Sequence, residues 1–390
     1  MIPPSPAPPI APGTVRRCTR CIMDSSDPEI TFDAAGICSH CHRFETLHRP
    51  NWFPNEEGAR RLARHVETIK AEGRGRDYDC IIGLSGGVDS SYLALKVKEL
   101  GLRPLVVHVD AGWNSELAVK NIEGLVKGLG YDLFTLVIDW EEMRDLQVAL
   151  LRSGVPNQDA AQDHAFSAGL YRFATREKIR WVLSGNNCAT EGILPSAWGY
   201  NAMDARHLRA IHRRFGRVPL RTFPLLSFFD LHVRIPILLG MKVLRPLDLM
   251  PYDKDAAKQE LATRFGWRDY GAKHYESVWT KYFQGYWLPA RFGYDKRRAH
   301  LSSLVVAGSL SRDEALAAMA RPTYPPEELR HDRAFVAKKL GLSEDELEAL
   351  RRAPLKTHRD YPNQERMQRA VRAVWLRLPK KAVRSRINRI

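Results

Sequence analysis

The chain has 390 residues, of which 44% are hydrophobic and 27% are charged, and its formal net charge is +15. The length allows roughly two or three domains, and the hydrophobic share excludes wholesale disorder. Six cysteines are too few for a disulfide scaffold, and no stretch approaches the roughly 18 uninterrupted apolar residues of a membrane-spanning helix. Residues 1–13 lack the features of a secretory signal, so we expect a disordered, proline-rich lead-in to a cytoplasmic protein.

Four of the six cysteines form two CxxC pairs near the N-terminus, Cys18 with Cys21 and Cys38 with Cys41. Paired CxxC motifs place four thiolates around a tetrahedral ion, and zinc is the natural occupant in a reducing cytosol. Because all four positions would be filled, residues 14–50 are predicted to form a structural zinc module that the metal helps to fold. An iron–sulfur cluster and two redox disulfides are the alternatives.

Residues 51–254 are predicted to form an α/β domain. Apolar residues recur at helical spacing within 51–75, and four short apolar runs then follow, with amphipathic stretches between them. We expect buried parallel strands at 78–84, 104–110, 133–139 and 181–185, and helices at 90–100 and 116–129. This alternation predicts a parallel sheet covered on both sides by helices. Residues 255–350 are predicted to form a mostly helical region.

A glycine-rich turn follows the first predicted strand and directly precedes a helix. It consists of Ser85, Gly86, Gly87, Val88, Asp89 and Ser90. Glycines let the backbone approach an anion closely, and the exposed amides at a helix N-terminus offer donors and partial positive charge to a phosphate. The two serine hydroxyls add donors, and the carboxylate of Asp89 either holds Mg²⁺ or caps the helix. The turn lacks the lysine of a Walker A loop. The alternative interpretation is a capped helix start without a ligand.

The full motif SGGVDSS resembles the PP-loop of the ATP pyrophosphatase superfamily, which includes asparagine, GMP and NAD synthetases and tRNA-thiolating enzymes. The resemblance implies that ATP is split between its α and β phosphates and that AMP is transferred to a carbonyl oxygen. By position, the residues that would bind the leaving pyrophosphate are Ser85, Gly86, Gly87, Asp89 and Ser90.

The same resemblance implies roles for residues that follow two later strands. Asp110, at the end of the second predicted strand, lies where the superfamily approaches the adenosine. The stretch LSGNN at 183–187 resembles a second loop on the nucleotide and metal side. The candidate residues of this loop are Gly185, Asn186, Asn187 and Glu191. The alternative is that the asparagines and the glutamate are polar residues that cap a loop.

Four longer stretches of the sequence indicate one particular family within this superfamily. The Cys-rich stretch 18–41, together with 266–277, 288–316 and 335–347, is similar to the N-acetyl sugar amidotransferase family of bacterial surface-polysaccharide biosynthesis. The resemblance covers about residues 16–350. It implies an ATP- and Mg²⁺-dependent ligase that adenylates the acetamido carbonyl of a nucleotide-linked sugar and replaces the oxygen with ammonia. Adenylation is chemically reasonable because AMP is a good leaving group and an amide oxygen is a poor one.

The source of the ammonia follows from what the sequence lacks. Ile2 follows Met1, so no N-terminal cysteine nucleophile is present. A triad-bearing glutaminase domain would need about 200 further residues. We therefore expect a separate glutaminase, and the family suggests one that resembles the glutaminase and cyclase subunits of imidazole glycerol phosphate synthase.

Charged residues in the C-terminal half are candidates for gripping an anionic substrate. One cluster contains Lys273, His274 and Glu276, and a second contains Asp295, Lys296, Arg297, Arg298 and His300. Guanidinium groups suit bidentate contact with carboxylates and phosphates. Lys296 and Arg297 are therefore predicted to act in catalysis, together with Ser85 and Asp89 of the glycine-rich turn. Surface salt bridges on helices are the alternative.

Residues 351–390 form a basic tail with 13 Lys and Arg against Asp360 and Glu365, a net charge of +11. Such a tail suits an anionic surface at the inner membrane, an acidic partner or nucleic acid, and a solvated terminal helix is the alternative. The charge by itself does not identify the substrate.

Two rival functions remain open. A tRNA-thiolating enzyme would use the basic tail on phosphates and would need a reactive Cys188, because Cys80 and Cys188 are the only cysteines outside the zinc module. We predict instead that Cys188 is structural and that nucleic acid is not the substrate. A non-catalytic, ATP-binding scaffold is disfavoured by the complete set of Ser85, Asp89 and Ser90.

Overall fold

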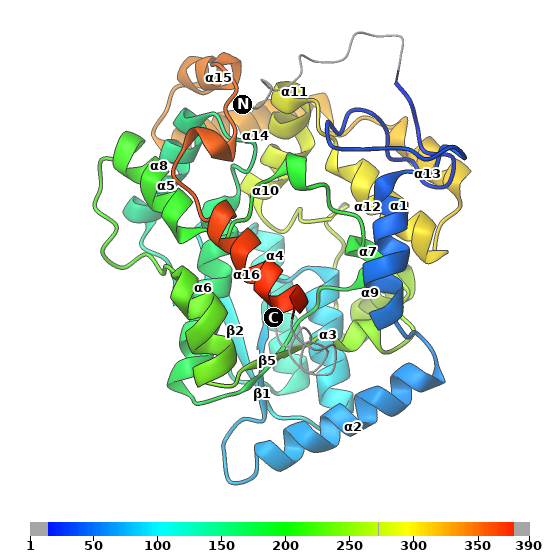
Figure 1. The fold of residues 1–390 in the computed structure, drawn as a ribbon. Helices are drawn as coiled ribbons and strands as arrows, with labels where there is room; N and C mark the ends of the chain where they lie inside the picture. The colour runs from blue at the N-terminus through cyan, green and yellow to red at the C-terminus, as the bar shows by residue number, and fades with distance from the viewer. Residues whose placement is uncertain (1–14, 272, 378–390) are drawn as a thin grey trace.

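The computed structural model describes residues 15–271 and 273–377 (Figure 1). At its centre lies a sheet of five parallel strands in the order β3-β2-β1-β4-β5. The strands are β1 (Cys80–Gly83), β2 (Pro104–Asp110), β3 (Leu133–Val137), β4 (Trp181–Leu183) and β5 (Lys242–Leu244). The predicted α/β class with a parallel sheet is confirmed, and four strands lie within the predicted runs. The fifth, β5, was missed because it has only two consecutive apolar residues, Val243 and Leu244.

Helices cover both faces of the sheet, because successive side chains of a strand point to opposite faces. In β1, Ile82 belongs to one core and Ile81 to the other. The first core is closed by α2 (Glu56–Glu72), α3 (Val88–Glu99), α4 (Glu116–Leu129) and α9 (Lys254–Phe265). The second is closed by α5 (Trp140–Ser153), α6 (Ala160–Arg176) and α8 (Ala205–Phe215). The central strands are therefore buried on both sides, as predicted.

The prediction of a buried strand at 133–139 is wrong in one respect. β3 lies at the edge of the sheet, where Phe134 is 37% exposed and Val137 is 69% exposed. A strand at the edge has a neighbour on one side only, so part of its apolar surface stays in contact with solvent. The apolar run alone does not distinguish an edge strand from a central one.

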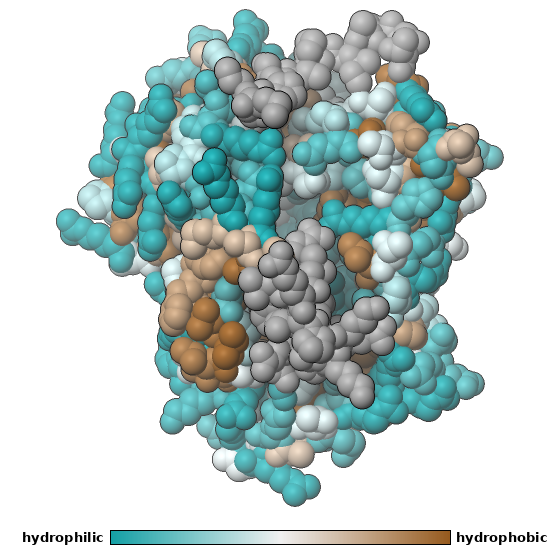
Figure 2. Space-filling view, in the orientation of Figure 1, coloured by the Kyte–Doolittle hydropathy of each residue, from teal (hydrophilic) through white to brown (hydrophobic). Residues whose placement is uncertain are grey.

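The C-terminal region is helical, as predicted. Its helices are α10 (Val278–Tyr282), α11 (Leu288–Phe292), α12 (Lys296–Ala307), α13 (Arg312–Met319), α14 (Pro326–Leu340), α15 (Glu344–Arg352) and α16 (Glu365–Arg377). Trp279 and Trp287 are fully buried and join this region to the core of α5 and α6. Among the described residues, no helix has the length and apolar character needed to cross a bilayer. Figure 2 shows a largely hydrophilic face.

The Cys-rich module forms a third, smaller core. Its helix α1 (Ser39–Arg43) and the short helix α7 (Cys188–Glu191) pack with α12 through Phe44, Ile193 and Ala299. The module therefore lies beside the C-terminal helices, although most of the chain separates the two in sequence (Figure 1). The predicted lead-in at 1–13 lies outside the described residues. So does the end of the basic tail, with Lys380, Lys381, Arg384, Arg386 and Arg389.

Candidate active site at the phosphate loop

The turn at residues 85–91, which we call the phosphate loop, joins the end of β1 to the start of α3. The hydroxyl groups of Ser85 and Ser90 lie 3.1 Å apart, and the amide of Gly87 donates to Ser85 Oγ at 3.3 Å. Gly87 is the N-cap of α3, and no side chain caps the helix there. The first turn of α3 therefore keeps amide donors for an anion.

Gly86 has a positive φ of +87°, which an L side chain rarely adopts. Its carbonyl oxygen accepts hydrogen bonds from Trp267 Nε1 and Tyr270 Oη, each at 2.9 Å. A Cβ atom at this position would lie 3.2 Å from the carbonyl oxygen of Ala118. The turn is therefore fixed from outside by the segment that follows α9.

The second predicted loop packs directly on the first. A Cβ atom at Gly185 would lie 3.1 Å from backbone atoms of Asp89 and Ser90, so only glycine fits without a shift. Asn187 Nδ2 donates to Asp89 Oδ1 at 3.4 Å, and Asn187 also caps α7 through the amide of Thr190. Asn187 thus caps α7, the alternative that the sequence left open, and also contacts Asp89 of the phosphate loop.

Asn186 and Asp110 also lie at this carboxyl edge of the sheet. Asn186 is exposed after β4, with its amide bound to Ser184 Oγ at 3.3 Å. Asp110 ends β2, the parallel neighbour of β1, and its Oδ1 accepts from the amide of Gly112 at 2.8 Å. Because carboxyl ends of parallel strands meet at one edge, the fold collects these predicted residues there.

Asp89 is the buried anionic centre of the site. Burial opposes ionisation, but Lys273, the hydroxyl of Tyr252 and Lys254 favour it, so the pKa of Asp89 is lowered. Burial also lowers the pKa of Lys254. The carboxylate is therefore charged at neutral pH and is surrounded by cations that suit a polyphosphate.

Lys273 forms ion pairs with a carboxylate from each of the two loops. Its Nζ lies 2.8 Å from Glu191 Oε1 and 3.6 Å from Asp89 Oδ2, and it donates to Thr190 Oγ1 at 3.1 Å. Burial opposes the charge of this ammonium group, but the two carboxylates raise its pKa. Since the ammonium group already lies between two converging carboxylates, the donor set fits a divalent cation such as Mg²⁺.

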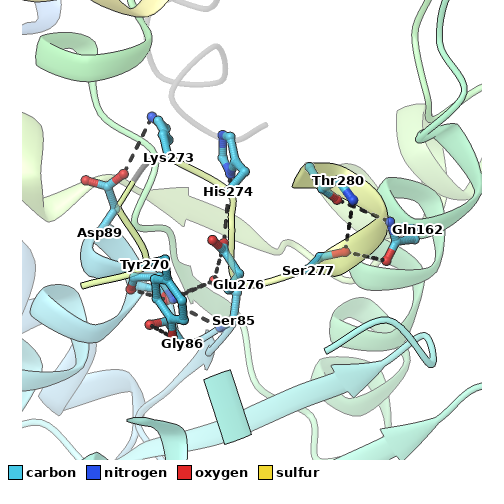
Figure 3. A network of polar contacts seen from close by, with 12 residues as sticks. Ser85, Gly86, Asp89, Gln162, Tyr270, Lys273, His274, Glu276, Ser277 and Thr280 are labelled. Atoms are coloured by element: carbon cyan, nitrogen blue, oxygen red, sulfur yellow. Dashed lines mark hydrogen bonds and ion pairs between the residues drawn. The ribbon is translucent and has the colours of Figure 1, made fainter. Parts of the chain in front are cut away.

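The segment 273–277 crosses the mouth of the phosphate loop (Figure 3). Glu276 Oε1 lies 3.5 Å from Ser85 Oγ and 3.9 Å from His274 Nδ1. His274 has a positive φ of 65°, an uncommon conformation for a residue other than glycine. A phosphate bound here would require Glu276 to share a cation with it or to turn away, because the two carry like charge.

The structure separates Lys296 and Arg297, the two residues of the C-terminal half that we predicted for catalysis. Arg297 is held by Asp295 in a bidentate ion pair, and its remaining donor reaches the carbonyl oxygen of Arg321 at 2.8 Å. Few of its donors remain for a ligand. Lys296, by contrast, is one of the cations that act on the carboxylates of the buried Asp159, the N-cap of α6, and of the exposed Asp163 on that helix.

The four cysteines of the N-terminal module converge. Their sulfur atoms all lie within 4.8 Å of one another, with separations of 3.9 Å for Cys18–Cys41 and 3.7 Å for both Cys21–Cys38 and Cys38–Cys41. A tetrahedron with Zn–S bonds of about 2.3 Å has edges of about 3.8 Å. Backbone amides also donate to Cys18 Sγ, which favours the thiolate form. The site fits zinc.

Hydrogen bonds and an ion pair connect this module to the helices beside the active site. Arg312 donates to the carbonyl oxygens of Cys18 and Cys21, at 3.1 and 3.2 Å. Arg298, on α12, forms an ion pair of 2.7 Å with the buried Asp24. The metal would therefore help to hold α12, whose first residue is Lys296, in place.

We expect the purified protein to contain about one zinc ion per chain, because a closed four-thiolate site has no vacant position. Metal analysis of the full chain checks this. The Cys18→Ser variant should lose the zinc and unfold at a lower temperature, whereas Cys188→Ala, which changes a cysteine outside the module, should keep it. Iron, or no metal, in the wild-type protein would contradict the assignment.

Cys188 lies in a structural environment. Its amide donates to Asp248 Oδ1 at 2.6 Å, and its thiol donates to Asp248 Oδ2 at 3.4 Å. Burial raises the pKa of the thiol to about 12, and burial lowers the pKa of the neighbouring His48. A neutral imidazole does not stabilise a thiolate. Cys80 begins β1, at the end of the strand away from the phosphate loop, so the two thiols are not brought together.

We therefore expect Cys188→Ala to retain at least half of the wild-type activity. The thiol is not poised as a nucleophile, and its loss removes one hydrogen bond to Asp248. Steady-state AMP formation checks this. Complete loss of activity in a variant with an unchanged melting temperature would favour a sulfur-carrying enzyme.

Residues 276–374 match the family model described as LPS biosynthesis protein WbpG-like, C-terminal domain. The match covers about a quarter of the chain, at its C-terminal side. This match confirms the predicted resemblance to proteins of bacterial surface-polysaccharide biosynthesis. The WbpG-like domain begins at Glu276, on the segment that crosses the phosphate loop.

The other matches to known proteins either cover a small part of this chain or have low sequence identity and low TM-scores. The tRNA(Ile)-lysidine synthase of Chlamydia pneumoniae is 33% identical over 96 residues, or 24% of this chain, and the match spans about a quarter (27%) of that relative. An NH3-dependent NAD synthetase from Campylobacter jejuni is 12% identical, with a TM-score of 0.29 over 40% of this chain and 72% of the other. The NMN synthetase of Francisella tularensis is 16% identical, with a TM-score of 0.29 over 55% and 87%. These structural likenesses carry no functional conclusion.

Several residues of the site were not predicted from the sequence. Tyr252 and Lys254 follow the missed strand β5, and Tyr270 lies in a stretch that we used only for the family resemblance. Asp159 and Asp163 lie on a helix that gave no motif. Tyr252 lies in the connection between a short helix (Pro246–Asp248) and α9, and Lys254 is the first residue of α9, positions that gave no sequence signal.

Proposed function

We propose that this protein is an ATP-dependent, AMP-forming amidotransferase. It adenylates the acetamido carbonyl of an N-acetylated, nucleotide-linked sugar, and ammonia then replaces the oxygen to give an acetamidino sugar for lipopolysaccharide or a related glycan. The WbpG-like match supports the pathway. The observation that carries the chemistry is the uncapped, glycine-containing phosphate loop, with Asp89 and Glu191 converging beside it on Lys273.

The first step would be attack of the acetamido oxygen on the α-phosphorus of ATP. The amides of the phosphate loop and the hydroxyls of Ser85 and Ser90 would bind the departing pyrophosphate. Lys273 would add a positive charge close to the same phosphates. Mg²⁺, held by Asp89 and Glu191, would neutralise charge on the phosphate oxygens.

The second step would be attack of ammonia on the activated carbon, with AMP as the leaving group. We propose that the ammonia comes from a separate glutaminase with a cyclase-like subunit. Binding of free ammonia from solution would be the slower route, since ammonium predominates at neutral pH and carries no free electron pair.

The tRNA-thiolating alternative is less well supported. It needs a reactive thiol, whereas Cys188 is buried, hydrogen-bonded to Asp248 and has a raised pKa. The basic tail that could contact phosphates includes residues outside the described range. The relative that acts on tRNA matches only 24% of this chain.

The proposal is tested by incubating the full chain with ATP, Mg²⁺, ammonium chloride and a panel of nucleotide-linked N-acetyl sugars. We expect AMP and pyrophosphate in equal amounts, and a sugar product lighter by about one mass unit, because oxygen is replaced by NH. ADP as the product, or AMP formation that requires tRNA and no sugar, would overturn the proposal.

A further inference from the structure

Asp163 stands out on the inward face of α6. Residues 158–162 and 164–165 are all buried, whereas Asp163 alone in this stretch is exposed. Its surroundings are nevertheless crowded, because charged groups of three other elements act on it: Glu191 of α7, His274 of the segment across the phosphate loop, and Lys296 of α12. The carboxylate is therefore open to solvent although charged groups of three other elements lie near it.

The neighbouring carboxylate, Asp159, is already occupied. It accepts from Gln162 Nε2 at 2.5 Å and from Thr280 Oγ1 at 3.0 Å. Gln162 in turn accepts from Ser277 Oγ at 3.4 Å, which ties α6 to the segment that carries His274 and Glu276 (Figure 3). Among the described residues, no side-chain hydrogen bond or ion pair is made by Asp163, so its carboxylate is available to a ligand.

A second polar group in the same place lacks a partner. Both ring nitrogens of His300 are buried and have no hydrogen-bond partner among the described residues. His300 lies one helical turn after Lys296 on α12, and its ring centre is 5.8 Å from that of His274. His274 and Lys296 thus act on both His300 and Asp163. The two unpartnered groups therefore share the same charged neighbours, and unpaired polar groups in such a setting call for a hydrogen-bonding ligand.

The proposed reaction creates a cation in its acceptor group. An acetamido group is uncharged, whereas an acetamidino group is protonated at neutral pH and presents two N–H donors in a fork, as a guanidinium group does. Resting on the proposed function, we propose that Asp163 is a catalytic residue that receives the proton of the attacking ammonia and then pairs with the amidinium product.

The step balances as follows. The electron pair of ammonia forms a C–N bond to the adenylated carbon, the π pair of its C=N bond moves onto the acetamido nitrogen, and the attacking nitrogen becomes positively charged. The carboxylate of Asp163 takes one proton from the attacking nitrogen. The C–O bond to AMP then breaks with its electron pair leaving on AMP, and an electron pair on nitrogen forms the C=N bond again. Because the acetamido nitrogen keeps its own proton, the product is an amidinium cation, and the carboxylic acid releases its proton to solvent to give an amidinium–carboxylate pair.

The charge state of Asp163 suits this role. Desolvation by the crowded surroundings and the nearby Asp159 together raise its pKa to about 7, against the opposing effect of Lys296 and His274. A carboxyl group with this pKa is a stronger base than an ordinary aspartate at neutral pH. Because the pKa is raised, the carboxylate is lost as the pH falls below about 7, and cation binding is lost with it.

The site can be tested without knowledge of the sugar. We would titrate the full chain with acetamidinium chloride and measure binding by NMR of the small cation, with acetamide as the uncharged analogue. Wild-type protein should bind acetamidinium, and Asp163→Asn should bind it about tenfold more weakly, as expected for loss of a charge-assisted pair. Binding by the wild type should also weaken about tenfold between pH 8 and pH 6.

The matched control is Asp132→Asn, which changes an exposed carboxylate at the opposite, amino end of β3. It should bind acetamidinium as the wild type does. Equal affinity in Asp163→Asn and wild type, or no binding by the wild type, would overturn the inference.

Activity measurements distinguish a failure of this inference from a failure of the proposed function. With a sugar that supports AMP formation, Asp163→Asn should lower the ammonia-dependent rate about 100-fold but retain sugar-dependent exchange of pyrophosphate into ATP, since adenylation precedes the proton transfer. Loss of both activities in a folded variant would overturn the catalytic role. Acetamidinium binding by a wild-type protein that forms no AMP with any acetamido sugar would instead overturn the proposed function.

Discussion

The Asp89→Asn variant is expected to lower the rate of AMP and pyrophosphate formation about 1000-fold, with little change in melting temperature. Asparagine keeps the shape of the side chain and can still contact Tyr252 and Asn187, but it lacks the charge that a divalent cation requires. Loss of one group that stabilises transition-state charge costs about 100- to 1000-fold in rate, and loss of a metal ligand adds to this. Steady-state measurement of pyrophosphate release at saturating ATP checks the prediction.

A surface aspartate provides the matched control. Asp255, on α9, has an 86% exposed side chain and makes one long ion pair of 3.5 Å with Lys258. Asp255→Asn should keep wild-type turnover. Near-normal turnover in Asp89→Asn would remove this carboxylate from the site, whatever the function of the protein.

The Lys273→Met variant is expected to lower the free energy of unfolding by about 3 kcal/mol in the absence of divalent cations. Methionine keeps most of the side-chain volume but leaves Asp89 and Glu191 facing each other without the ammonium group between them. Removing one partner of a buried ion pair leaves uncompensated charge at this cost. Urea unfolding, followed by circular dichroism, measures the change.

Added Mg²⁺ should reverse much of this loss, because the two carboxylates can then share the metal in place of the ammonium group. The control is Lys96→Met. Lys96 also bridges two carboxylates, Glu99 at 2.9 Å and Glu260 at 3.4 Å, but in a more exposed setting. The Lys96→Met substitution should lower the free energy of unfolding by less than about 1 kcal/mol. This variant should show no greater response to Mg²⁺ than the wild type. An equal response in both variants would show that the metal does not bind between Asp89 and Glu191.

The predictions from sequence succeeded where chemistry is local. The phosphate loop could be recognised because a strand, two glycines, an aspartate and a helix follow one another directly, and the structure places them as expected. The convergence of the four cysteines could be predicted because CxxC spacing fixes two sulfur atoms at a time. In both motifs, the residues that set the geometry lie within a few sequence positions of one another.

The prediction of Lys296 and Arg297 shows the limit of this approach. The two are adjacent in sequence and chemically alike, yet Arg297 pairs with Asp295 while Lys296 acts on the carboxylates of α6. On a helix, neighbouring residues point in directions about 100° apart. Which of them faces the site depends on how α12 packs, and no local pattern records that.

The sequence by itself determined the parallel α/β sheet, the phosphate loop and the four-cysteine module, because each follows from periodicity or from fixed spacing. Only the tertiary structure decided which distant groups complete the site. Lys273 bridges loops that lie more than 80 residues before it, and Asp163 meets Lys296 across two elements. The physical reason is that burial and charge pairing depend on distances in space, and folding brings these groups together without leaving a trace in the order of residues.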